Sequence, residues 1–108
     1  MKFFYGCSSL TSLDLSSLNT QKVKYMDANF YKCSSLTYKN LSNFNVENVM
    51  HLSWMFGYCS SLTSIDLSHF NTKSLLRMNE MFKYCKSLIS VNLSNFNTLK
   101  VTSMNYTF

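Results

Sequence analysis

The 108-residue sequence contains no proline and only two glycines, Gly6 and Gly57. Most globular domains use these two residue types to mark their turns, so turns in this chain must depend on other residues. Serine and asparagine are abundant, and both form turns by hydrogen-bonding to nearby backbone groups.

Charged residues are also scarce, at 14% against 46% hydrophobic, a balance that excludes intrinsic disorder. No apolar run approaches the roughly 18–20 residues of a membrane helix, so we expect no membrane span. The net charge of +5 comes from scattered lysines and one arginine, Arg77. Because these cations form no cluster, the sequence favours a solvated lysine-bearing face and predicts no nucleic-acid partner.

An internal repeat runs through the whole chain. Cys7, Cys33, Cys59 and Cys85 are spaced by 26 residues, and the sequences around them align without a gap. Constant spacing in this range is typical of stacked repeats. The sequence therefore predicts one array over 1–108, with units 3–28, 29–54, 55–80 and 81–106 and the start of a fifth at 107–108.

Two hydrophobic periods alternate within a unit. In "LTSLDLS", Leu13 and Leu15 alternate with polar residues, which predicts a short strand with one buried face. Val23, Met26, Phe30 and Cys33 follow at intervals of three, four and three, which predicts an amphipathic helix of about three turns. The Asn-Thr pairs upstream, such as 71–72, suit a helix N-cap.

One strand and one helix cannot bury their own apolar faces, whereas stacked copies can. We therefore expect an α/β repeat solenoid of about four coils. Short parallel strands would form its concave sheet, and helices would cover its convex side.

The pattern Leu10-x-x-Leu13-x-Leu15 is the opening of a leucine-rich repeat, and "MFxxCSSLTSxxLSxFNT" resembles the BspA-like leucine-rich repeat family over the whole chain. The resemblance implies a surface protein that acts in adhesion and binds other proteins. Two features depart from the pattern. Lys39 replaces a buried strand residue, and the repeat asparagine comes one residue late, after Leu18, Phe44, Phe70 or Phe96.

The four cysteines occupy equivalent core positions of successive units, so neighbouring thiols would point the same way. That arrangement disfavours disulfides and lacks the close pairs of a metal site, and it favours buried free thiols. His51 and His69 fall in different repeat positions, and no serine, cysteine and acid are obviously arranged around either as a triad. We therefore expect no catalytic residue, no cofactor and no metal, and hence no enzyme.

The outward positions of the predicted strands are the candidate partner-binding face, with a solubilising ladder of hydrogen-bonded side chains as the alternative. This concave face comprises Ser12, Asp14, Ser16, Tyr38, Asn40, Ser42, Ser64, Asp66, Ser68, Ser90, Asn92 and Ser94.

These features predict a protein-binding repeat module, one segment of a cell-surface adhesion protein, with a protein partner that the sequence does not identify. An intracellular interaction scaffold and a purely structural spacer are the alternatives.

The opening "MKFFYGC" resembles a lipoprotein signal, but its apolar stretch is too short and its cysteine belongs to the repeat. Without a signal peptide here, a cytoplasmic location stays open beside a surface or extracellular one. Both ends lack polar capping coils, so we expect the terminal coils either to fray or to stack head to tail on another copy.

Overall fold

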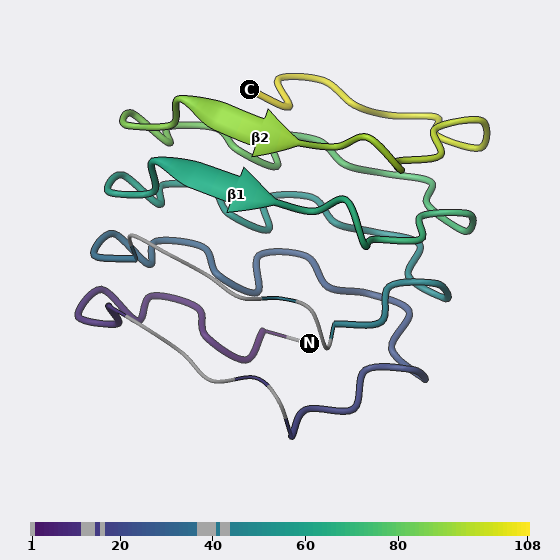
Figure 1. Cartoon of the computed structure of the whole chain (residues 1–108), viewed down its shortest axis with the longest axis horizontal. Helices are drawn as coiled ribbons and strands as arrows, with labels where there is room; N and C mark the ends of the chain where they lie inside the picture. Colours follow the sequence, from purple (N-terminus) through teal and green to yellow (C-terminus); the bar gives the residue numbers. More distant parts are fainter. Residues whose placement is uncertain (1, 12–14, 16, 37–40, 42–43) are drawn as a thin grey trace.

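The computed structural model describes residues 2–11, 15, 17–36, 41 and 44–108. The chain winds in successive turns that stack on one another from the N-terminal to the C-terminal end (Figure 1). Two short strands, β1 (Ser64–Asp66) and β2 (Ser90–Asn92), lie side by side in the upper turns. They pair in parallel, with Ser64 opposite Ser90 and Asp66 opposite Asn92, so the register of the sheet equals the 26-residue repeat.

The prediction of an α/β solenoid with helices on its convex side is wrong. No helix occurs in the described part of the chain. That part therefore contains no helix long and apolar enough to cross a membrane. β1 and β2 occupy the strand positions predicted for the third and fourth units. The corresponding positions of the first two units, Leu13 and Lys39 among them, lie outside the described residues.

Backbone hydrogen bonds between turns replace the predicted helix. The amides of Met26, Ala28, Phe30 and Lys32 donate to carbonyls 25 residues further along, at 2.8–3.0 Å. Alternate residues therefore bond to the next turn, as in a parallel sheet, and the i→i−4 bonds of a helix are not made. A second line of single parallel pairings, at Tyr25, His51, Arg77 and Ser103, lies beside this ladder.

Two residues in each turn have left-handed backbone, which a helix cannot accommodate. The first group is Ala28, Trp54, Glu80 and Tyr106, and the second is Gly6, Lys32, Tyr58 and Tyr84, with φ between 53° and 74°. Left-handed geometry costs a non-glycine residue about 1–2 kcal/mol. Its recurrence in every repeat indicates that the inter-turn hydrogen bonds offset this cost.

The spacing that predicted a helix comes from consecutive tight turns. The amide of Cys33 bonds to the carbonyl of Phe30, and the amide of Leu36 bonds to that of Cys33, both at 3.1 Å. Such three-residue steps bring these apolar side chains to one side of the chain. They lie in the core with 0% exposure.

Identical residues of successive units stack on one another, in the core for Phe30, Phe56 and Phe82 and outside it for half-buried Phe4 and exposed Phe108. Phe4, Phe30, Phe56, Phe82 and Phe108 form a phenylalanine ladder with ring centroids 5.3–5.6 Å apart and interplanar angles of at most 11°. Cys33 and Cys59 are buried as predicted, whereas Cys7 and Cys85 are half-buried, and all four are free thiols.

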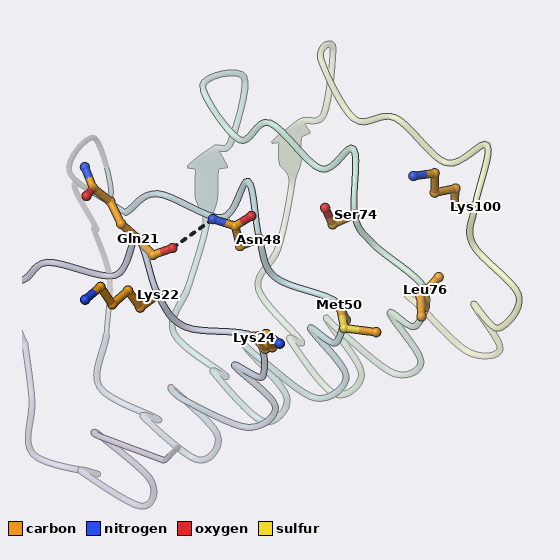
Figure 2. Close-up of a pocket in the computed structure, with 8 residues that line it drawn as sticks. All are labelled: Gln21, Lys22, Lys24, Asn48, Met50, Ser74, Leu76 and Lys100. Carbon is orange, nitrogen blue, oxygen red and sulfur yellow. Dashed lines mark hydrogen bonds between the residues drawn. The ribbon is translucent and has the colours of Figure 1, made fainter.

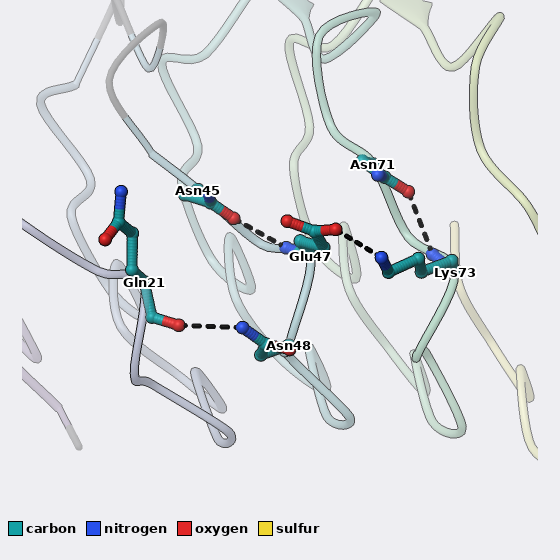
Figure 3. A network of polar contacts seen from close by, with 6 residues as sticks. All are labelled: Gln21, Asn45, Glu47, Asn48, Asn71 and Lys73. Atoms are coloured by element: carbon teal, nitrogen blue, oxygen red, sulfur yellow. Dashed lines mark hydrogen bonds and ion pairs between the residues drawn. The ribbon is translucent and has the colours of Figure 1, made fainter.

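The Asn-Thr pairs hold neighbouring turns together and do not cap helices. Buried Thr20 donates from Oγ1 to the carbonyl of Asn45 and accepts from the Asn45 amide, each at 2.9 Å. Thr72 and Asn97 repeat this reciprocal pair. The Asn45 side chain accepts the Glu47 amide at 2.9 Å, which makes an Asx turn. Figure 3 shows this turn beside the ion pair of Glu47 with Lys73 and the bond from Asn48 to the carbonyl of Gln21.

Candidate functional site

The structure brings together the predicted strand-face residues of the third and fourth units. Asp66 and Asn92 are exposed and directly opposite each other in the β1–β2 pair, and Ser64 and Ser90 are likewise exposed and paired. Ser94 is exposed and Ser68 is half-buried. The remaining six predicted positions, Ser12, Asp14, Ser16, Tyr38, Asn40 and Ser42, lie outside the described residues.

The acceptors of this face are engaged with their own backbone. The Asp66 carboxylate accepts the Ser68 amide at 2.8 Å, and the Asn92 side chain accepts the Ser94 amide at 3.1 Å. The Ser68 backbone amide lowers the pKa of Asp66 below 3.8, with the Ser68 hydroxyl as the second cause. These side chains end the strands in Asx turns, which leaves small polar groups as the exposed surface of the described part of the face.

A second surface, which the sequence did not identify, gathers aromatic and lysine side chains on the side of the stack where the turns are tightest. We call it the aromatic strip, and it comprises Tyr5, Tyr31, Trp54, Tyr58, Tyr84 and Tyr106 with Lys2, Lys32 and Lys83.

The rings of the strip contact one another across turns. Tyr5 stacks on Tyr31 with centroids 5.0 Å apart, and Tyr31 meets Tyr58 edge-on at 5.3 Å. Tyr58 stacks on Tyr84 at 4.5 Å. Trp54 packs edge-on against Tyr31 at 5.6 Å and is only half-buried. The rings thus form one continuous row along four turns.

Lysines cover parts of this row. The Lys83 ammonium lies 5.3 Å from the ring centroid of Trp54 and 5.0 Å from that of Tyr106. It also donates to the Glu80 carboxylate at 2.5 Å, and this hydrogen bond raises the pKa of Lys83 above 10.5. The ammonium therefore stays cationic at neutral pH and holds cation–π contacts with rings from two turns.

Gly57 permits this packing. A Cβ at position 57 would lie 2.8 Å from Cε3 of Trp54 and 3.1 Å from Cδ2 of Tyr31, closer than a side chain tolerates. The glycine is therefore required by the close approach of two rings.

The strip borders a hollow of about 780 Å³ lined by Gly6, Ser8, Lys32, Ser34, Tyr58, Ser60, Tyr84 and Lys86. Serine hydroxyls and lysine ammonium groups thus lie beside exposed tyrosine edges. Aromatic side chains with polar handles are enriched at protein interfaces, because they bury large areas at a small cost in conformational entropy.

The described residues contain no group of three or more His, Cys, Asp or Glu that could hold a metal ion. His51 lies 3.7 Å from Asp27, and His69 bonds to the carbonyl oxygen of Leu41 at 2.7 Å.

The aromatic strip was visible in the sequence as one aromatic residue between the repeat phenylalanine and cysteine, in "FYGC", "FYKC", "FGYC" and "FKYC". The aromatic residue lies one position later in the third and fourth units than in the first two. It therefore does not form a single column of the repeat, and the row was not recognised from the sequence.

The model of one protein family, described as Mycoplasma protein of unknown function, DUF285, matches residues 1–108. No curated protein and no solved structure matches the chain.

Proposed function

The chain belongs to this family, and we propose that it is a non-enzymatic protein-binding module whose contact surface is the aromatic strip. The observation that carries the proposal is the continuous row of tyrosine and tryptophan rings with lysines above it. Trp and Tyr dominate the binding energy of protein interfaces when they are displayed on a rigid surface.

The support of the strip is rigid. Its rings are carried by residues in or next to the inter-turn ladder, with the amide of Tyr58 bonded to Lys83 at 2.8 Å and that of Trp54 to Asn79 at 2.9 Å. Rings that are ordered before binding lose little conformational freedom when a partner arrives. A stacked repeat also lengthens such a surface with each unit that it adds.

The setting of this binding is a further part of the proposal. The family resemblance in the sequence favours adhesion at a cell surface, and the alternatives are an intracellular scaffold and a spacer without a partner. The strand face of Ser64, Asp66, Ser90 and Asn92 is a secondary candidate surface. The side-chain oxygens of Asp66 and Asn92 already accept backbone amides of their own turns, so they are less available to a partner.

Binding to immobilised extracellular matrix proteins and to cytosolic lysate tests the proposal with the same variants. Tyr84→Ser combined with Tyr106→Ser removes two exposed rings of the strip, which are 49% and 73% accessible. Tyr25→Ser is the matched control, because Tyr25 is 48% accessible and is not part of the strip. Circular dichroism and thermal melting establish that each variant is folded.

We expect saturable binding to at least one protein that the double variant loses and the Tyr25→Ser control keeps. Equal binding by the two variants would remove the strip as the contact surface. A partner found only in cytosol would overturn the surface setting, and no saturable binding to either source would favour the spacer.

A further inference from the structure

A groove of about 520 Å³ lies away from the aromatic strip and crosses four successive turns. Its lining consists of Gln21, Lys22, Lys24, Asn48, Met50, Ser74, Leu76 and Lys100 (Figure 2). Apart from Gln21, these residues belong to two lines of the repeat. The first line runs through positions 22, 48, 74 and 100, and the second runs through 24, 50 and 76.

The groove is cationic at its ends, and its two middle turns contribute the polar side chains of Asn48 and Ser74 and the apolar ones of Met50 and Leu76. Lys22 and Lys24 come from the first turn and Lys100 from the fourth, and all three are exposed. Half-buried Met50 and Leu76 come from the two turns between them. No ion-pair partner is found for these three lysines in the described part of the chain, whereas nearby Lys73 is paired with Glu47.

The floor of the groove is held by backbone hydrogen bonds between turns. The amide of Met50 donates to the carbonyl of Lys24, and the amide of Leu76 donates to that of Met50, both at 2.8 Å. At the rim, Asn48 donates from Nδ2 to the carbonyl of Gln21 at 2.9 Å. The positions of the cationic and apolar side chains are therefore set by the stacking itself.

The geometry points to an extended acidic peptide as the occupant, with acidic residues at positions i and i+4 and a large apolar residue at i+2. The first and fourth turns are separated by three inter-strand steps of about 4.8 Å each. The distance between them is therefore about 14 Å. Four residues of extended chain cover about 13 Å, and residues i, i+2 and i+4 point to the same side. The two carboxylates then meet the lysines at the two ends, while the apolar side chain covers Met50 and Leu76.

Carboxylates of a peptide fit this groove better than the phosphates of a nucleic acid. Phosphate-binding surfaces use closely spaced cations along a continuous track. Here uncharged side chains, Met50 and Leu76 among them, interrupt the cations for two turns, and no arginine is found among the described residues that line the groove. A peptide of alternating character matches both the charges and the apolar centre.

Fluorescence anisotropy with defined probes tests the inference on the full chain. The matching probe is the labelled peptide Gly-Glu-Ser-Leu-Ser-Glu-Gly. The register control, Gly-Ser-Glu-Leu-Glu-Ser-Gly, has the same composition and charge but places its acids two residues apart. A labelled oligothymidine of similar length is the nucleic-acid probe.

We expect the matching peptide to bind at least about five-fold more tightly than the register control, the factor that corresponds to one additional weak ion pair. Lys24→Gln with Lys100→Gln should weaken the matching peptide about ten-fold or more. Lys73→Gln with Arg77→Gln removes the same charge at two exposed residues that do not line the groove, and should leave the affinity within about two-fold.

Each other outcome overturns the inference. Equal affinity for the two peptides would mean attraction by net charge alone. Equal losses in the two double variants would mean that the groove is not the site. Tighter binding of oligothymidine that depends on Lys24 and Lys100 would reassign the groove to single-stranded nucleic acid.

Discussion

The sulfur of Cys59 lies 3.1 Å from the carbonyl oxygen of Phe30 and donates a hydrogen bond to it across one turn of the stack. Cys33 and Cys85 make the same bond to Phe4 and Phe56, at 3.1 and 3.0 Å. The cysteine thus serves as a small core residue that also satisfies a backbone acceptor of the preceding turn, a role that alanine cannot fill.

Cys59→Ala should therefore lower the free energy of unfolding by about 1–2 kcal/mol, because it removes buried volume and leaves the Phe30 carbonyl without this donor. Urea denaturation measures the change. Cys7→Ala is the control, since Cys7 is half-buried in the first turn, and its effect should stay within about 0.5 kcal/mol. Equal losses in the two variants would contradict a specific role of the buried thiol.

Burial raises the pKa of the Cys85 thiol to about 11. The unfolded thiol loses its proton near its usual value of 9.0, so between about pH 9 and 11 the unfolded state binds fewer protons than the folded state. The contribution of this group is fully present below pH 9 and is lost as the pH rises toward 11. Denaturation midpoints at pH 8 and 10.5 should fall more for the wild type than for Cys85→Ser, and parallel falls would exclude the effect.

The 26-residue interval predicts from sequence alone which residues become neighbours. Phe30 stacks on Phe56, Cys33 and Cys59 lie in the core, and β1 pairs with β2 in the repeat register. These contacts follow from a gapless repeat, because equivalent positions stack when successive turns have the same length.

The helix was predicted wrongly because two structures give the same apolar spacing. Phe30 and Cys33 are three residues apart either in a helix or in a tight turn. What decides between them is the left-handed backbone at Ala28 and Lys32, and neither residue type signals it. Propensity favours helix at both positions, and the inter-turn hydrogen bonds override it.

The aromatic strip escaped prediction for a related reason. Its tyrosines occupy two adjacent repeat positions, and Tyr31 contacts Tyr58 across the turn, where Gly57 leaves room for the Tyr31 ring. A column-by-column comparison of the units separates these residues, while the fold places them side by side.

Gly57→Ala should destabilise the protein by about 1–3 kcal/mol, because the new methyl group would press on Trp54 and Tyr31 and displace both rings. The emission of Trp54, the single tryptophan, should shift to longer wavelength as the ring becomes more exposed. Gly6→Ala is the matched control. Its Cβ meets open space but its φ is +74°, so we expect a loss of stability without a change in emission.

The Asp66 carboxylate should titrate with a midpoint below 3.8, since the bond from the Ser68 amide favours its charged form. A lowered pKa contributes stability above the unfolded value, and this is lost as the pH falls through the folded pKa. Carboxyl carbon chemical shifts measured by NMR report the midpoint directly. Asp66→Asn should keep the turn, as Asn92 does, and should reduce the loss of thermal stability between pH 4 and 2.5. A midpoint at or above 3.8 would refute the role of the turn.

Asn29 occupies the repeat position that holds Met55 and Met81, and its side chain is fully buried. Its Oδ1 accepts the Phe3 amide at 3.3 Å, but its Nδ2 has no hydrogen-bond partner among the residues that the structure describes. A buried donor without a partner costs about 1–3 kcal/mol. Asn29→Met replaces it with the apolar side chain of the neighbouring turns, and the half-buried Phe3 amide can bond to water.

We expect Asn29→Met to raise the free energy of unfolding by about 1 kcal/mol, measured by urea denaturation. Asn29→Ala removes the same unpaired donor but leaves the space of the side chain empty, so its gain should be smaller or absent. A lower midpoint for Asn29→Met than for the wild type would show that the bond to Phe3 outweighs the unpaired amide.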